Sequence, residues 1–266
     1  MNILKKLALL LTAAMLLSLF GCASLRPANP VSDFDYYVHE DKQCIYILTY
    51  IGESKDVVIP AYIENLPVRL IADSAFRGSS VENVVLPNTV EEIGPYAFRG
   101  CKQLKTIQFS TKLKLIDTEA FRGCTSLEKV TLPNGLVTLD SGAFHSCTAL
   151  REISIPGTVK TFGQEIFAGC QSIENVTFEH GLEVIGERAM FTSTKIKTLV
   201  IPSSVKEINR GTFDFLKLDS ITFLGDAPII DEDEFVSCPS NFTIYYDPNT
   251  SGWDNTPLSQ YNLVAK

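Results

Sequence analysis

The sequence repeats itself about every 23 residues, and this period constrains the fold more than any other feature. Each repeat is marked by a large apolar residue, and seven consecutive intervals between these markers are 22 or 23 residues long. The markers are Phe76, Phe98, Phe121, Phe144, Phe167, Met190, Phe213 and Phe235. A unit this short cannot bury its own apolar residues, so successive units must stack into a solenoid with one continuous core.

Each repeat begins with a short alternation of apolar and polar residues, such as Ile107-Gln108-Phe109. This period of two predicts a strand with one buried face, and a following proline often ends it because proline cannot donate to a ladder. We expect the strands to form one parallel sheet, with the marker-bearing turns or helical turns on the opposite wall. Apolar pairs such as Val90 and Ile93 should fill the far side of each coil. The expected strands span 57–59, 84–86, 107–109, 130–132, 153–155, 176–178, 199–201, 221–223 and 244–246.

The recurring pattern Leu-x-x-Ile-x-Ile-Pro-x-x-Val-x-x-Ile-Gly-x-x-Ala-Phe-x-x-Cys resembles the BspA-type leucine-rich repeats of bacterial surface proteins. The resemblance covers about residues 34–255. It implies a leucine-rich-repeat solenoid with about 23 residues per repeat, displayed outside the cell and without a shared catalytic site. It also suggests an N-terminal cap over 34–68, repeats over 69–240, and a C-terminal cap or terminal strand over 241–266.

The first 21 residues have the features of a secretion signal. Lys5 and Lys6 precede an apolar run that is short for a membrane span and ends Leu19-Phe20-Gly21-Cys22, which is similar to a bacterial lipobox. We therefore expect cleavage before Cys22, lipid attachment to its thiol and a short linker over 22–33, with the protein facing outward. The alternative is ordinary cleavage after the small residues Gly21-Cys22-Ala23.

Metabolic labelling with a palmitate analogue distinguishes these two forms of processing. We expect the wild-type chain to incorporate the label and the Cys22→Ser variant to lose it. An unlabelled wild-type chain would rule out the lipid anchor.

The net charge limits the classes of partner. The chain carries a formal charge of −8, and removal of the leader takes away two lysines and no acidic residue, which gives −10. This acidity argues against nucleic acid and anionic lipid as partners. We expect a monomer whose only membrane contact is the N-terminal lipid.

Five cysteines share one position of the repeat, three residues after the marker. They are Cys101, Cys124, Cys147, Cys170 and Cys238. None forms the close pair typical of a metal site. In a stack, the Cα atoms of neighbouring cysteines are close enough for a disulfide. Their side chains run parallel, however, which keeps the Cβ atoms too far apart for the bond to form. We interpret the column as a ladder of small core residues, with disulfides as the alternative.

The sequence contains no recognisable catalytic motif, so we predict no catalytic residue, no metal and no cofactor. The three histidines adjoin no nucleophile in a known arrangement. The acidic run 231–234 lacks the glycine and the spacing of a calcium loop, which favours a solvated face.

Two columns of exposed residues are the candidate binding surfaces. On the sheet face we expect a neutral, hydroxyl-rich platform formed by Gln108, Thr131, Ser154, Thr177, Thr222 and Tyr245. The alternative is that threonine simply suits a half-solvated strand. Beside the markers, a basic column of Arg77, Arg99 and Arg122 could meet an acidic partner, unless nearby acids such as Asp117 and Glu119 offset it.

The sequence thus predicts a surface lipoprotein that binds an extracellular protein, as an adhesion module. Two alternatives remain. One is a glycan-capture lipoprotein that uses the aromatic residues Tyr245, Tyr246 and Trp253, and the other is a purely structural component of the envelope.

Overall fold

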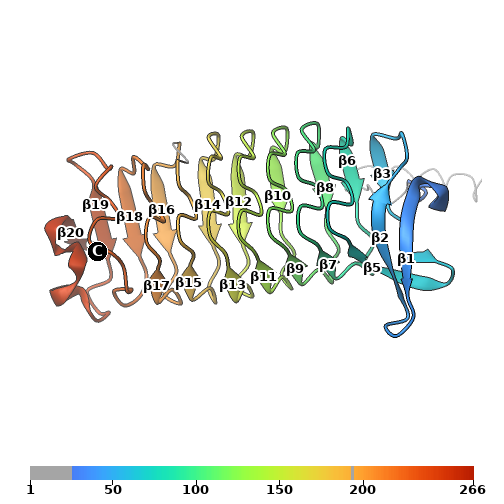
Figure 1. Cartoon of the computed structure of the whole chain (residues 1–266). Coiled ribbons are helices and arrows are strands. Elements are labelled where there is room, and N and C mark those ends of the chain that lie inside the picture. The colour runs from blue at the N-terminus through green and yellow to red at the C-terminus, as the bar shows by residue number, and fades with distance from the viewer. Residues whose placement is uncertain (1–25, 193–194) are drawn as a thin grey trace, which may run out of the picture.

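The protein is an elongated stack of coils, one for each repeat (Figure 1). The computed structural model describes residues 26–192 and 195–266, so the expected leader over 1–21 and Cys22 lie outside the described residues. Within those two ranges, no helix is long and apolar enough to cross a membrane. The predicted solenoid is confirmed.

One face of the stack is a column of parallel strands that we call the front sheet. All nine predicted strands are present, and each begins one residue before its predicted start. They are β3 (Asp56–Val58), β6 (Asn83–Val85), β8 (Thr106–Gln108), β10 (Lys129–Thr131), β12 (Glu152–Ile155), β14 (Asn175–Phe178), β16 (Thr198–Ile201), β18 (Ser220–Phe223) and β19 (Thr243–Tyr246). Each strand turns its second residue into the core, as Val84, Val130 and Ile153 show.

Hydrogen bonding along the front sheet is interrupted twice. The paired groups are β3-β6-β8, β10-β12-β14 and β16-β18-β19-β20, where β20 (Asn262–Ala265) adds a strand at the C-terminal end. The expected single sheet is therefore a column of three groups. Strands of three or four residues offer few ladder bonds, so the loss of one pairing is enough to separate two groups.

A second column of strands, not predicted from the sequence, forms another wall of the stack. It contains β5 (Leu66–Ile71), β7 (Glu92–Ile93), β9 (Leu115–Ile116), β11 (Thr138–Leu139) and β13 (Thr161–Phe162), followed by the separate pair β15 (Val184–Ile185) and β17 (Glu207–Ile208). Most of these strands are two residues long, which is too short to show an alternating pattern. We call this column the second sheet.

The turns that carry the phenylalanines are linked by backbone hydrogen bonds rather than by helices. The N–H groups of Phe76, Phe98 and Phe121 donate to the alanine carbonyl of the next turn, over 2.7, 2.7 and 2.8 Å. Two residues before a phenylalanine, Glu119 and Glu165 adopt left-handed backbone angles, with φ of 51° and 53°. This conformation is uncommon for residues other than glycine, so the stack must hold the turn in shape.

The phenylalanine side chains from Phe76 to Phe167 stack through the core, and Phe213 stacks on Phe235 beyond Met190. Ring centroids are 4.8 Å apart between Phe76 and Phe98, 5.1 Å between Phe98 and Phe121, and 5.2 Å between Phe121 and Phe144. These interplanar angles lie between 3° and 18°. Offset stacking at such distances adds to the burial of large apolar area, so this column holds neighbouring repeats together.

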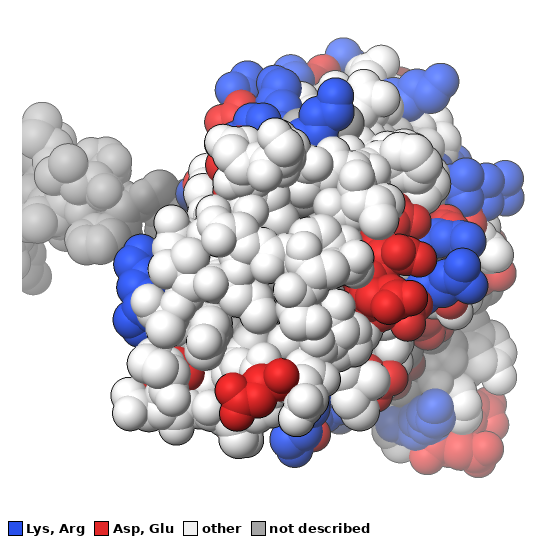
Figure 2. Space-filling view, turned by 90° about the vertical axis from the view of Figure 1, so that its left-hand side faces the viewer, with Lys and Arg blue, Asp and Glu red and all other residues white. Residues whose placement is uncertain are grey.

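Both ends of the stack are capped. At the N-terminal end, the short helix η2 (Val31–Asp33) leads into the hairpin of β1 (Phe34–His39) and β2 (Cys44–Tyr50), and β4 (Tyr62–Ile63) pairs with β5. At the C-terminal end lie η3 (Trp253–Asn255), η4 (Pro257–Gln260) and β20. Viewed from this end, the surface is mostly uncharged, with acidic and basic side chains near its margin (Figure 2).

Candidate functional site

The cysteine column is buried within the turns. Cys101, Cys124, Cys147 and Cys170 are completely buried, and all six cysteines in the described residues are free. Each of these four thiols donates to the phenylalanine carbonyl of an earlier turn. The Sγ···O distance is 3.0 Å for Cys101 and 3.2 Å for the other three. A thiol fits this position because it is small and also supplies a hydrogen bond to that carbonyl.

Burial also makes these thiols chemically inert. It raises the pKa of Cys124 and Cys147 well above the ordinary value, and that of Cys170 to about 12. A thiol with so high a pKa stays protonated at neutral pH, whereas nucleophiles and metal ligands are thiolates. Cys238 is half-buried, and its Sγ lies 3.7 Å from the Leu216 carbonyl oxygen.

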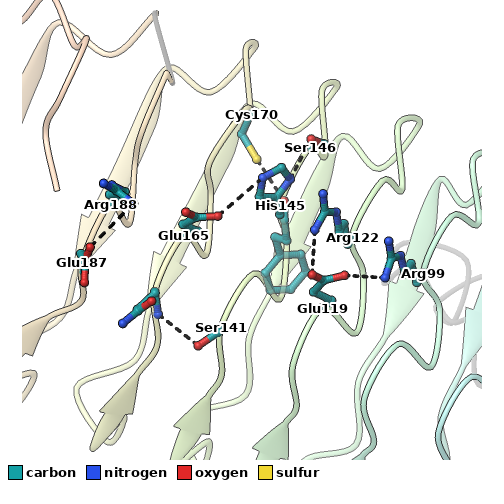
Figure 3. Close-up of polar contacts among 12 residues, drawn as sticks. Arg99, Glu119, Arg122, Ser141, His145, Ser146, Glu165, Cys170, Glu187 and Arg188 are labelled. Atoms are coloured by element: carbon teal, nitrogen blue, oxygen red, sulfur yellow. Dashed lines mark hydrogen bonds and ion pairs between the residues drawn. The ribbon is translucent and has the colours of Figure 1, made fainter. Parts of the chain in front are cut away.

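The basic column carries less free charge than its sequence indicates. Arg99 and Arg122 both pair with Glu119, over 2.8 and 2.7 Å, so that one carboxylate lies between two guanidinium groups (Figure 3). Arg77 is exposed and makes no ion pair with another described residue. One carboxylate offsets only one of the two guanidinium charges, so the three arginines and Glu119 together keep a net charge of +2, half of it at Arg77.

His145 follows in the same column and does not extend the positive charge. Burial, and then the nearby Arg122, lower its pKa, so the imidazole is neutral at neutral pH. Its ring nitrogens lie 2.8 Å from the Ser146 hydroxyl and 3.9 Å from the Glu165 carboxylate (Figure 3).

The middle of the front sheet contains a shallow depression of about 300 Å³, which we call the sheet groove. Thr131, Ser154 and Thr177 lie in register on three adjacent strands and all line this groove. The structure thus brings together three of the six residues predicted for the sheet face. The other lining residues are Lys129, Val130, Leu132, Asn134, Glu152, Ile153, Asn175 and Glu179.

Polar side chains around the sheet groove divide into paired and free groups. Lys129 pairs with Glu152 over 2.5 Å, and the Ser154 hydroxyl donates to Glu179 over 3.0 Å. The hydroxyls of Thr131 and Thr177 make no hydrogen bond with another described residue, and both side chains are exposed. The groove therefore offers two free hydroxyls between fixed charges.

Gln108 lies in a separate depression of about 570 Å³ at the N-terminal part of the front sheet. A ladder of polar contacts borders it. Arg26 pairs with Asp56 over 2.8 Å, Asn83 donates to Asp56 over 2.6 Å, and Thr106 donates to Asn83 over 2.6 Å. These side chains satisfy one another, which leaves fewer groups free for a partner than in the sheet groove.

Thr222 and Tyr245 lie on β18 and β19, apart from both depressions. The Lys266 ammonium lies 4.3 Å from the centre of the Tyr245 ring. Trp253 is only 6% exposed, and its ring stacks on Tyr246 with 4.8 Å between centroids. Its indole N–H also donates to Thr250 over 3.0 Å. The aromatic residues expected to form a glycan platform are thus largely part of the packing of the C-terminal cap.

The acidic run 231–234 contains one buried member, contrary to the expectation of a solvated face. Glu234 is 2% exposed, and its carboxylate accepts hydrogen bonds from the backbone N–H groups of Gly211 and Phe213. Burial raises its pKa to about 7, although the two N–H donors oppose this rise. The carboxylate joins the last repeat to its neighbour.

Three charged residues that border the sheet groove, Lys129, Glu152 and Glu179, were not predicted as site residues. Lys129 and Glu152 occupy the first strand position and Glu179 follows a strand, so their approach depends on stacking between repeats. In the described part of the chain, no group of three or more histidine, cysteine, aspartate or glutamate residues is arranged to hold a metal.

Comparisons with known proteins agree with this architecture. The chain matches the family model described as BspA type Leucine rich repeat region, in six copies over residues 69–190 and 149–260. It is similar to the crystal structure of a leucine-rich-repeat protein from T. pallidum, with 26% identity and a TM-score of 0.63. That similarity covers 80% of this chain and 91% of the other.

A second similar structure is that of a leucine-rich cell surface protein from Faecalibacterium prausnitzii A2-165. The identity is 24% and the TM-score 0.62, over 86% of this chain and 73% of the other. We found no match to the chain among curated proteins.

Proposed function

Because the chain belongs to the BspA-type leucine-rich-repeat family, we propose that it acts at the cell surface as a binding module for an extracellular protein. The observation that carries this proposal is the sheet groove, where Thr131, Ser154 and Thr177 lie in register between charged side chains. The proposal assigns binding to this surface and no chemical step.

The chemistry of the sheet groove favours a protein partner. It has no aromatic lining residue on which a sugar ring could stack. Its small side chains leave room for side chains of a partner, and Lys129, Glu152 and Glu179 supply charges of both signs at its border. Such mixed charge on a solvated surface gives specificity and orientation to protein association.

The buried core supports this role because it fixes the binding surface in advance. Strands β10, β12 and β14 are held by ladder hydrogen bonds and by the apolar residues beneath them. A surface that is ordered before association loses little conformational entropy on binding. Display outside the cell is supported by the lipobox around Cys22, and the lipid would tether this surface to the envelope.

Filling the sheet groove should weaken binding to the protein partner. The partner is first captured with the wild-type chain from a mixture of extracellular proteins. We expect Thr131→Trp and Thr177→Trp to lower the affinity at least tenfold, which corresponds to about 1.4 kcal/mol, because the indole occupies the groove. Biolayer interferometry with the captured protein measures this change.

Thr161→Trp is the matched control, since Thr161 is an exposed threonine on β13 of the second sheet. It should bind as the wild type does. If all three variants keep full affinity, the partner binds elsewhere on the stack.

A further inference from the structure

Three aromatic rings cluster on the hairpin of the N-terminal cap. Tyr37 and Tyr46 are opposite each other on β1 and β2, with ring centroids 6.3 Å apart. The His39 ring lies 6.1 Å from Tyr37 and 5.2 Å from Tyr46. Tyr37 is 52% exposed, and the other two rings are half-buried. This cap cluster is therefore open to solvent and does not form part of the core.

A depression of about 320 Å³ adjoins the cap cluster, and we call it the cap pocket. Tyr46 lines it, and Leu70 is the partner of Tyr46 on the neighbouring strand β5. Glu92 follows in register on β7. The cap pocket thus has an aromatic and aliphatic surface on one side and a carboxylate on the other.

Polar groups of both kinds surround the cap pocket. Arg69 and Glu91 form an ion pair at its border. The Lys42 ammonium lies 5.7 Å from the centre of the Tyr46 ring and makes no ion pair with another described residue. The Lys42 backbone N–H approaches His39 Nδ1 at 3.4 Å.

We propose that the cap cluster and the cap pocket together bind a pyranose unit of a glycan. The C–H face of a sugar ring carries partial positive charge and packs on the negative face of an aromatic ring such as Tyr46. Its hydroxyl groups are both donors and acceptors, which matches the combination of Lys42 and Glu92. This site is separate from the sheet groove and does not depend on the proposed protein partner.

The size and charge of the site favour a sugar over other ligands. Small-ligand sites have volumes of about 300–1,000 Å³, and the cap pocket lies at the lower end of that range. A cationic ligand is disfavoured because the Lys42 ammonium already places a positive charge at the cap pocket. Glu91 and Glu92 disfavour a phosphorylated ligand, and the lining ring of Tyr46, which has no counterpart in the sheet groove, favours a sugar over a protein.

A glycan array followed by calorimetric titration tests this proposal. The purified chain is applied to an array of mono- and oligosaccharides, and the sugar that binds best is titrated into the wild type and the variants. We expect Tyr46→Ala and Lys42→Ala each to weaken its binding at least tenfold, whereas Tyr46→Phe keeps most of the affinity because the ring remains.

Tyr62→Ala is the matched control, because Tyr62 is a tyrosine of the same cap, 61% exposed on β4 and outside the cap pocket. It should bind like the wild type, and thermal melts should show that the other variants are folded. Thr131→Trp should also keep full sugar affinity, which separates this site from the sheet groove. The proposal is wrong if no sugar binds, or if folded Tyr46→Ala binds as well as the wild type.

Discussion

Replacing Phe121 with alanine should lower the free energy of unfolding by about 3–5 kcal/mol, the largest effect that we expect from a single substitution. Phe121 is completely buried and stacks between Phe98 and Phe144. Phe109 also packs edge-on against it, with 5.7 Å between centroids. The substitution therefore leaves a cavity at an interface between repeats, and urea denaturation followed by circular dichroism measures the loss.

Phe215→Ala is the matched control for this stack. Phe215 is 53% exposed and lies outside the core, so its loss should cost less than about 1 kcal/mol. Equal losses for the two variants would show that the stacked rings are not what joins the repeats.

The second large effect is a fall in stability as the pH rises from about 4.5 to 7. Glu234 has its pKa raised from 4.5 to about 7 by burial, so the folded state holds a proton that the unfolded state has released. The contribution of Glu234 to the free energy of unfolding is fully present below pH 4.5 and is lost as the pH rises through 7. The rise in pKa corresponds to about 3 kcal/mol, an order-of-magnitude value.

Glu234→Gln isolates this contribution, because glutamine does not titrate. At low pH the variant should be about as stable as the wild type, since the amide resembles the protonated carboxyl in presenting one carbonyl oxygen to the two backbone N–H groups. Its stability should fall less between pH 4.5 and 7 than that of the wild type. His145 contributes with the opposite sign, because its lowered pKa makes folding release protons in the upper part of this range. Both proteins contain His145, so its contribution cancels when the dependence of the unfolding free energy on pH is compared between wild type and variant. The same dependence in both proteins would contradict the role of Glu234.

The fold could be predicted because residues that face the core recur at the same position of every repeat. Phe76 and Phe98 identify the same position in adjacent coils, and the alternation around Ile107 identifies a strand. Stacking then follows, because no single coil can bury these side chains. The second sheet could not be predicted, because a two-residue strand such as Glu92–Ile93 is too short to show an alternation of apolar and polar residues.

The site could be predicted only in part, because its properties depend on contacts between coils. The column of Thr131, Ser154 and Thr177 follows from the repeat length alone. That Glu119 pairs with two arginines depends on side-chain positions in adjacent turns. The burial of Trp253 depends on how the last residues fold back over the final coil. Neither property is visible in the spacing of residues along the chain.

Site-specific photo-crosslinking tests the central claim, that the sheet groove is where a protein binds. A diazirine amino acid is placed at Asn134, which lines the groove, and separately at Lys160, an exposed position beside the second sheet. We predict that irradiation in a mixture of extracellular proteins joins a protein to the chain labelled at 134 and not to the chain labelled at 160. Adducts only from position 160, or from neither position, would contradict the account.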